Sequence, residues 1–326
     1  WFVGKPDVTR NEAHASSRQE RKAGFNDRKK GIRNLSNAIS KPPSKPLLHA
    51  KRTKIGPGGQ PIGSFTTNPA EVDSIAKEAW QKIYQGNVDN MGAAVTQFFR
   101  KYAAFIYISA PWIANPIQGD EVRDVCVHGK KSAAGMDKWE PAELALLSIE
   151  LFEMIALLLN TIEAGAPWPD GTRHARAAFL SKDPNKMEDP LAFRVLLILS
   201  TLYRRWASIR LRALRPWCDA WSLLEMYAGA GTLGAEDAWY EVATDFEQWA
   251  LNNVPFVGGT VDIAKCFDQI LRPLVYALAS AAGMPPHILD AYQRFQEGLM
   301  VHNTIAGGVG TGFSRSCAIP QGCPFS

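Results

Sequence analysis

The chain has 326 residues, of which 46% are apolar and 10% aromatic. It therefore has the material for a sizeable core, and its composition excludes a protein that is disordered overall. The formal net charge of +4 hides an asymmetry, because residues 1–60 hold 14 Lys and Arg against 4 Asp and Glu, which leaves 22 against 28 in the rest. A detached basic segment is typical of proteins that meet nucleic acid or a membrane surface, although a solvated tail has the same composition.

Cysteine usage argues against a zinc-binding protein, and hydropathy argues against a membrane-spanning one. The five cysteines are scattered, without a Cys-x-x-Cys pair or a histidine at ligand spacing, which indicates a reducing, intracellular compartment, nuclear or cytoplasmic, and no zinc site. Residues 144–159 form the longest apolar stretch, but Glu150 and Glu153 interrupt it, so we expect no membrane span. The chain begins with Trp1 and stops directly after "IPQGCPFS", and we expect both ends to be cuts in a longer protein.

The first part of the chain is predicted to be a basic, disordered extension over residues 1–68. Its segments "KPPSKP" and "GPGGQPIG" cannot bury enough surface to offset the entropy of ordering. Residues 69–128 follow as a helical region. Asn68 before Pro69 is a candidate N-cap, and the helical pattern runs to residue 105.

Next comes a loop, "KKSAAGMDKWEPAEL", that opens a helix expected from Pro141 through Asn160. Residues 176–200 then alternate short apolar runs with a polar, proline-containing turn, which predicts a β-hairpin with a long tip. Lys182 and Arg194 place one cation on each arm, near that tip.

Ser200 or Thr201 is expected to cap the following helix. Its outer face is predicted to be strongly basic, and the arginines concerned are Arg204, Arg205, Arg210, Arg212 and Arg215. Such a face is either merely solvated or, with Trp206 and Trp217 beside it, a surface for a phosphate backbone.

Two glycine-rich segments raise the alternative of a nucleotide-binding loop. "GAGTLG" at 229–234 fits the spacing of a dinucleotide-binding fingerprint and would suit a nicotinamide-dependent oxidoreductase, but no short β-branched strand precedes it. A turn before a helix over residues 236–251 explains it better. "GGVGTG" at 307–312 lacks the Lys-Ser or Lys-Thr of a phosphate loop.

The segment "TVDIAKCFDQI" carries the most specific chemistry. A strand over residues 256–263 would end near Asp262, whose carboxylate, with the Ile263 carbonyl, could bind Mg²⁺. Two-metal phosphoryl transfer needs at least one more acidic ligand, so a strand-end cap or an ion pair is the alternative for this aspartate. Asp268 is expected to cap the next helix. Two helices, a hairpin and the turn "PQGCP" follow.

Taken in order, these segments resemble the reverse transcriptases of non-LTR retroelements (retrotransposons) and group II introns. In that family the aspartate motif reads like "DIxKAFDxI" and a downstream motif like "GIPQGCPLS", and the resemblance covers about residues 130–326. It implies an α+β fold of the right-hand polymerase type, largely helical with short β-hairpins. Residues 129–255 would be the fingers and residues 256–326 a partial palm.

The resemblance also implies roles around the aspartate motif. Asp262 looks like the first catalytic, metal-binding aspartate, with Ile263 lending its carbonyl. The backbone N–H groups of Lys265 and Cys266 would face the incoming triphosphate. Phe267 corresponds to the aromatic residue that blocks a ribose 2′-hydroxyl.

Further roles fall on the fingers and on the downstream motif. Lys182 and Arg194 resemble the cations that clamp the phosphates, where fixed positive charge stabilises charge that shifts during transfer. Gln321 and Gly322 resemble the turn beneath the nascent base pair. The basic helix would bind nucleic acid through Arg204, Arg205, Arg210 and Arg212.

Some features depart from the family pattern. Val195 and Leu196 follow Arg194 where Pro-Ile is common, Ala318 stands where a glycine often precedes Ile-Pro-Gln-Gly, and Cys266 replaces a common alanine. The second catalytic motif, an aromatic residue followed by two aspartates, would come after Ser326.

The implied function is therefore that of a reverse transcriptase fragment. The parent enzyme would copy an RNA template onto a DNA primer with deoxynucleoside triphosphates and Mg²⁺, or with Mn²⁺ as an alternative, and no membrane would be involved. This chain alone is expected to be inactive. The alternative is a non-catalytic nucleic-acid-binding module or a decayed retroelement copy.

Overall fold

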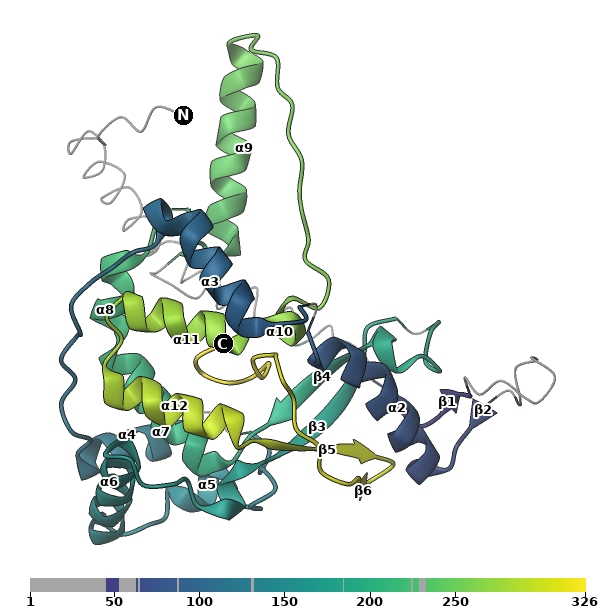
Figure 1. Ribbon diagram of the computed structural model, residues 1–326, viewed down its shortest axis with the longest axis vertical. Helices are drawn as coiled ribbons and strands as arrows, with labels where there is room; N and C mark the ends of the chain where they lie inside the picture. The colour runs from purple at the N-terminus through teal and green to yellow at the C-terminus, as the bar shows by residue number, and fades with distance from the viewer. Residues whose placement is uncertain are drawn as a thin grey trace, which may run out of the picture. The chain divides into compact units, whose positions relative to one another are not determined.

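The described residues form a mixed α+β structure that is about half helical (Figure 1). The computed structural model describes residues 45–52, 63, 65–86, 88–129, 132–183, 185–223, 225–228 and 233–326. Residues 45–326 cluster as one compact unit.

A four-stranded sheet lies at the centre of this unit, in the order β4-β3-β5-β6 (Figure 1). Its strands are β3 (His174–Ser181), β4 (Phe193–Ile198), β5 (Met300–Ile305) and β6 (Gly308–Val309). The predicted hairpin over residues 176–200 is confirmed, because β3 and β4 pair antiparallel from Arg176 opposite Ile198 to Ser181 opposite Phe193. The second predicted hairpin is confirmed in β5 and β6, and β5 pairs in parallel with β3 across more than a hundred residues of sequence.

The helices precede and surround the sheet strands. Before β3 lie α2 (Pro69–Tyr84), α3 (Met91–Tyr102), α4 (Gly119–Val127), α5 (Pro141–Leu144) and α6 (Ile149–Glu163). Between β4 and β5 lie α7 (Thr201–Ala213), α8 (Arg215–Trp221), α9 (Ala235–Leu251), α10 (Cys266–Gln269), α11 (Arg272–Ala281) and α12 (Pro286–Glu297). The short 3₁₀ helices are η1 (Ala103–Phe105), η2 (Asp170–Arg173) and η3 (Pro190–Ala192). Helix α4 packs on α6 and α7, and α12 packs on α6 and α11.

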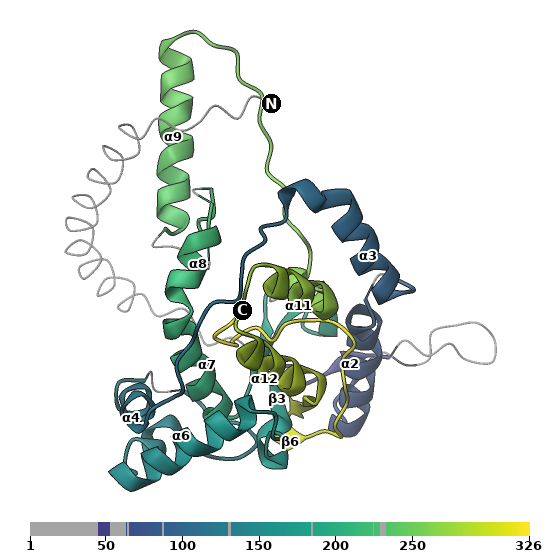
Figure 2. The same ribbon diagram turned by 60° about the vertical axis from the view of Figure 1, so that its left-hand side comes forward.

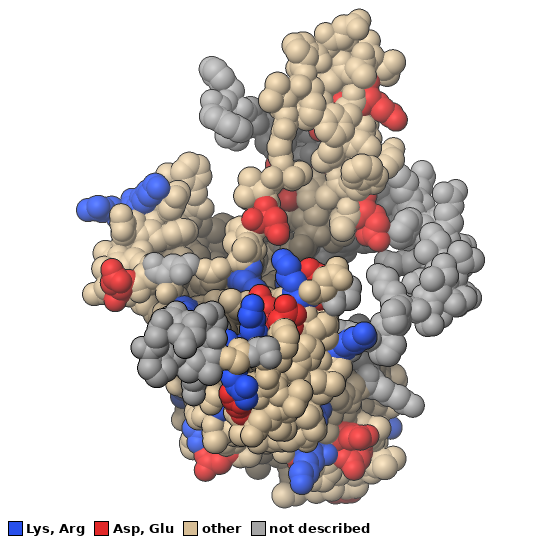
Figure 3. All heavy atoms as spheres, turned by 90° about the vertical axis from the view of Figure 1, so that its right-hand side faces the viewer, with Lys and Arg blue, Asp and Glu red and all other residues tan. Residues whose placement is uncertain are grey.

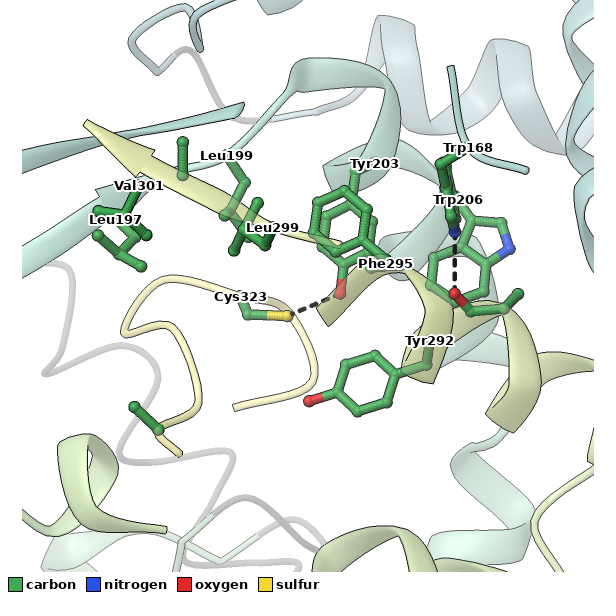
Figure 4. Packing of buried hydrophobic residues seen from close by; sticks show 14 of the residues in the cluster. Trp168, Leu197, Leu199, Tyr203, Trp206, Tyr292, Phe295, Leu299, Val301 and Cys323 are labelled. Atoms are coloured by element: carbon green, nitrogen blue, oxygen red, sulfur yellow. Dashed lines mark hydrogen bonds between the residues drawn. The ribbon is translucent and has the colours of Figure 1, made fainter. Parts of the chain in front are cut away.

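Aromatic rings form the centre of the core (Figure 4). Tyr203 of α7 stacks on Phe295 of α12 with their ring centroids 3.5 Å apart, and Trp168 and Trp206 meet them edge-on or tilted. The Tyr203 hydroxyl lies 3.2 Å from the Cys323 thiol sulfur. The turn near the end of the described chain is therefore fixed to the same core as the sheet and the helices.

Most predicted helices form, but two of them are broken. Asn68 caps α2 as predicted, since its side chain accepts a hydrogen bond from the Ala70 N–H. The helix expected to run to residue 105 stops near Gly86, which has a φ of +80°, and a new N-cap at Asn90 begins α3. The helix expected over residues 141–160 is similarly divided into α5 and α6, because Ser148 has an extended backbone.

Part of the predicted basic extension forms regular structure in the described residues. Residues 1–44, 53–62 and 64 lie outside the described residues, but β1 (Ala50–Lys51) pairs with β2 (Phe65–Thr66). Leu47 and Ala50 are buried, and Arg52 forms an ion pair with Glu71 of α2 at 2.6 Å. Burial of these few apolar side chains offsets part of the conformational entropy that is lost when this segment becomes ordered. Composition alone had suggested that this entropy loss would prevent ordering.

None of the described helices is both long and apolar enough to cross a lipid bilayer.

Candidate functional site

Lys265 joins the aspartate motif to the β3–β4 hairpin. Its backbone is left-handed, with φ at +52°. Its ammonium donates hydrogen bonds to the carbonyls of Leu191 at 2.7 Å and Phe193 at 3.1 Å, and it lies 4.2 Å from the ring centroid of Trp80. Burial lowers the pKa of the Lys265 ammonium, and the positive charge of Lys182 lowers it further.

The two predicted fingers cations lie on the same face of the hairpin. The Lys182 N–H donates to the Ala192 carbonyl and continues the ladder past Ser181. Arg194 stands opposite Leu180, and residues two apart along a strand share a face, so Lys182 and Arg194 are diagonal neighbours. Both Arg194 and Lys182 are exposed. The two cations are therefore close enough on one face of the hairpin to contact the same anionic group.

Asp268 is a buried carboxylate that the sequence assigned to a different role. It was expected to cap the next helix, but the N-cap of α11 is Leu271, so that assignment is wrong. Burial raises the pKa of the Asp268 carboxyl, although the positive charges of Lys265, Arg315 and Lys182 lower it. Asp268 and Arg315 are buried in this group of one carboxylate and three cations, whereas Lys182 is exposed.

Arg315, which sequence reasoning missed, completes that charge cluster. Its guanidinium lies 5.4 Å from the ring centroid of Tyr84, and its Nη2 atom has no hydrogen-bond partner among the described residues. Burial lowers the pKa of Arg315 and raises that of the Tyr84 hydroxyl. The signal available in the sequence was a cation in the segment "SRSC", directly before the turn at residues 318–322.

The turn at residues 318–322 lies against both the aspartate motif and the hairpin. The Ile319 N–H donates to the Phe267 carbonyl and the Ala318 N–H to the Ile270 carbonyl, both at 2.9 Å. Gly322 has a φ of +102°, and a Cβ placed on it would lie 3.2 Å from the Leu196 side chain of β4. Only glycine adopts this conformation without strain so close to a neighbour. Gln321, beside it, is half-buried.

The strand predicted over residues 256–263 does not form. In this stretch no backbone N–H donates to a described carbonyl, and Val257 and Val261 are 97% and 94% exposed. A β-strand is stable only when a neighbour completes its ladder, and none of the described strands lies beside this one. Asp262 and Ile263 are consequently exposed and without regular secondary structure, rather than held at the end of a strand.

The residues of the aspartate motif therefore fall into two groups with different surroundings. Lys265 contacts the β3–β4 hairpin, and Asp268 lies among the cations Lys265, Arg315 and Lys182, whereas Asp262 is exposed on the stretch that forms no strand. Cys266 and Phe267 begin the short helix α10 with exposed side chains, and Phe267 is 40% exposed.

The predicted basic face of α7 is wrong for two of its arginines. Arg205 is buried, and Arg210 is only 1% exposed: its guanidinium pairs with Glu163 at 2.6 Å and donates to the Asn115 carbonyl at 2.8 Å. Helix α4 packs on α7, and Glu163 at the end of α6 binds Arg210, so these side chains lie in the core. The helical pattern of α7 alone cannot show that Arg210 will be paired with a buried acid, Glu163, on another helix.

The other three arginines predicted for that face are already engaged, and Arg215 lies on α8, where it pairs with Asp219 at 3.6 Å. Arg204 donates to the Ser132 hydroxyl and the Ala133 carbonyl, and burial lowers its pKa. Arg212 is exposed and pairs with Asp124 of α4. A nucleic-acid surface built on α7 would have to compete with these contacts.

The fit of the predicted metal can be tested on the donors themselves. Asp262 and the Ile263 carbonyl supply oxygen, the ligand type that Mg²⁺ prefers. Among the described residues no group of three or more His, Cys, Asp and Glu is close enough to hold a metal ion. The donors therefore fit Mg²⁺ in kind but not in number.

The two glycine-rich segments have separate positions. Residues 229–232 of "GAGTLG" lie outside the described residues, and Gly234 is the N-cap of α9, where its N–H donates to the Asp237 carboxylate. Residues 307–312 form the turn and the second arm of the β5–β6 hairpin, in which Gly307 has a φ of +82°. No helix follows that turn in the described part of the chain, so it lacks the geometry of a phosphate loop.

Comparison with known proteins adds no family to this geometry: a scan against protein-family models finds no match, and a search of the curated proteins finds no match either.

Proposed function

We propose that this chain is part of a reverse transcriptase-like, template-directed DNA polymerase, comprising fingers (residues 129–255) and the beginning of a palm (residues 256–326). The observation that carries the proposal is the meeting of three segments that are remote in sequence. The aspartate motif, through Lys265 and Phe267, contacts both the β3–β4 hairpin and the turn at residues 318–322. A polymerase of this type needs these three parts around one nucleotide.

Ala318 gives independent support for the resemblance. The family often has glycine at this position, and Ala318 has a φ of +85°. That region of backbone space favours glycine, because a Cβ crowds the backbone there. The backbone at Ala318 thus has a conformation suited to glycine at the position where the resemblance expects glycine. An ordinary turn unrelated to the family would not need to have this conformation at this position.

The proposed chemistry assigns each group a task. Lys182 and Arg194 bind the triphosphate and stabilise negative charge as it moves to the leaving pyrophosphate. Lys265, already bound to the hairpin backbone, orients the motif, and the ring of Phe267 excludes a 2′-hydroxyl. Asp262 and the Ile263 carbonyl would supply oxygen ligands for Mg²⁺, and two-metal phosphoryl transfer would need at least one further acidic ligand beside them.

The rival function is a non-catalytic nucleic-acid-binding module. It used the basic extension and the basic face from Arg204 to Arg215, and burial of Arg205 and Arg210 removes two of the arginines assigned to that face. The encoded sequence after Ser326 separates the two: an aromatic residue followed by two aspartates within roughly a hundred residues suits the polymerase, which requires a second acidic ligand.

The test is primer extension by a protein that continues through that second motif. Asp262→Asn is expected to lower the extension rate at least about 100-fold, because an electrostatic ligand of the transition state is lost. The affinity for an RNA template annealed to a DNA primer should change less than about twofold, since Asp262 is not a phosphate contact.

Asp245→Asn on α9 is the matched control, because Asp245 is also an exposed aspartate but lies outside the proposed site. It should leave the extension rate unchanged. Extension that survives Asp262→Asn undiminished would remove this aspartate from the mechanism, and the polymerase proposal with it.

A further inference from the structure

Helix α9 carries an apolar stripe along one side. Trp239, Val242, Phe246 and Trp249 follow one another at i, i+3, i+7 and i+10, the spacing that aligns side chains on one face of a helix and that paired helices use at their interface. Trp239 is 72% exposed, and Val242 and Phe246 are also exposed. The sequence of this helix therefore predicts that one of its faces packs against another part of a protein.

The described chain does not bury this face. No residue of α9 is buried, and the helix stands apart from the other described helices and strands (Figures 1 and 2). Phe256 covers the C-terminal end of the stripe, with its ring centroid 4.5 Å from those of Phe246 and Trp249. Trp239 and Val242 remain exposed beyond it. Contiguous exposed aromatic surface of this kind marks interaction sites.

The charge of α9 narrows the chemistry of its partner. Residues 235–251 contain five acidic residues and no Lys or Arg; the acids are Glu236, Asp237, Glu241, Asp245 and Glu247. The upper part of the face seen in Figure 3, where α9 lies, accordingly shows red but no blue atoms. By helical geometry, Glu236 and Asp245 fall on opposite flanks of the stripe.

These charges exclude several occupants. The phosphates of a nucleic acid would be repelled even though bases could stack on the aromatic rings. A second copy of α9 would place five acids against five, and like charges across an interface oppose pairing. An anionic lipid surface is disfavoured for the same reason.

We propose that α9 is a docking helix for a basic amphipathic helix of a partner protein. The partner would place apolar side chains against Trp239 and Val242 and Lys or Arg beside Glu236 and Asp245, as in helix pairs whose flanking charges select the partner. This surface is separate from the proposed nucleotide site, so the inference does not depend on the polymerase proposal.

The experiment uses the full 326-residue chain and a defined probe. The probe is a fluorescein-labelled synthetic peptide of roughly three heptads, with Leu at the a and d positions and Lys elsewhere. A second peptide replaces every Lys by Glu. Fluorescence anisotropy at about 0.15 M ionic strength, where distant charges are screened, gives the affinity of each peptide.

The Leu/Lys peptide is expected to bind, and the Leu/Glu peptide to bind at least about tenfold more weakly. Trp239→Ala should weaken binding of the Leu/Lys peptide at least about tenfold, as removal of a central aromatic anchor does. Asp245→Lys should also weaken it. The matched controls are Leu157→Ala on α6, which is 68% exposed, and Glu78→Lys on α2, and both should leave the affinity within about twofold.

Several outcomes would overturn the proposal. Equal effects of Trp239→Ala and Leu157→Ala would make the binding nonspecific, and equal binding of the two peptides would remove the charge argument. Self-association of the chain that Trp239→Ala abolishes, measured by light scattering, would assign the face to a second copy. Binding of a thymidine oligonucleotide that Trp239→Ala abolishes would assign it to nucleic acid. Val242→Ser provides a second stripe variant should Trp239→Ala alter the circular dichroism spectrum.

Discussion

Ala318 is buried with a positive φ of +85°, next to the two backbone hydrogen bonds that hold the turn against the aspartate motif. A side chain in this backbone region costs roughly 1 kcal/mol or more, because the Cβ crowds the backbone. The strain persists because the neighbouring hydrogen bonds and the Cys323 contact fix the turn. The contacts of the turn, and not the preference of alanine, therefore set this backbone conformation.

We predict that Ala318→Gly stabilises the chain by roughly 1 kcal/mol, since relief of strain outweighs the larger entropy of glycine in the unfolded state. The matched control is Ala177→Gly in β3, which is equally buried but lies in a regular strand. That change should destabilise by about 1 kcal/mol. Urea denaturation of both variants measures the difference, and a destabilising Ala318→Gly would show that no strain is stored there.

At the scale of an element, residues 256–263 have strand composition without a strand. Their β-branched side chains suit a strand, but the segment has no regular secondary structure. What is lacking is a ladder partner among the described residues, and without one the apolar side chains stay in water. Local preference fixes backbone shape, but burial requires a neighbour.

A pair of valine substitutions tests this difference. Val261→Ala is expected to change the free energy of unfolding by less than about 0.5 kcal/mol, as exposed positions do. Val301→Ala in β5, where the side chain is fully buried, should cost about 2 kcal/mol through lost transfer energy and a cavity. A cost above 1 kcal/mol for Val261→Ala, measured by chemical denaturation, would mean that this segment is packed in solution.

At the scale of the whole molecule, a buried ion pair joins segments far apart in sequence. Arg210 of α7 binds Glu163 at the end of α6 and the Asn115 carbonyl before α4, and Glu163 also accepts from the Trp206 indole at 2.7 Å. These helices surround the aromatic core that supports the sheet. The contact therefore specifies how the helices sit on one another, more than it adds net stability.

Breaking this pair is predicted to cost much more than breaking an exposed pair on the same helix. Glu163→Gln should lower the free energy of unfolding by roughly 3 kcal/mol, because it leaves the Arg210 charge buried without a counter-ion. Asp124→Asn removes the exposed partner of Arg212 and should cost less than about 1 kcal/mol. Guanidinium denaturation of the two variants decides the matter, and similar costs would contradict the importance assigned to burial.

Local signals in the sequence were sufficient for much of the fold and for part of the site. The Asn68 cap, the β3–β4 hairpin, and the helices α9, α11 and α12 all follow from side-chain spacing and from residues with restricted backbones, which act within a few positions. The same kind of signal placed Lys182 and Arg194 on one hairpin and singled out the turn that contains Gly322.

Only the tertiary structure decided the parts that depend on distant residues. The burial of Arg205 and Arg210, the parallel pairing of β3 with β5, the charge cluster of Asp268 with Arg315, and the unpaired state of residues 256–263 each rest on which neighbour is present or missing. Hydrogen-bond ladders and buried charges are completed by partners that a helical or strand pattern does not encode. The sequence by itself determined which segments can be helices, hairpins and turns, and packing between remote segments determined which of their side chains face solvent.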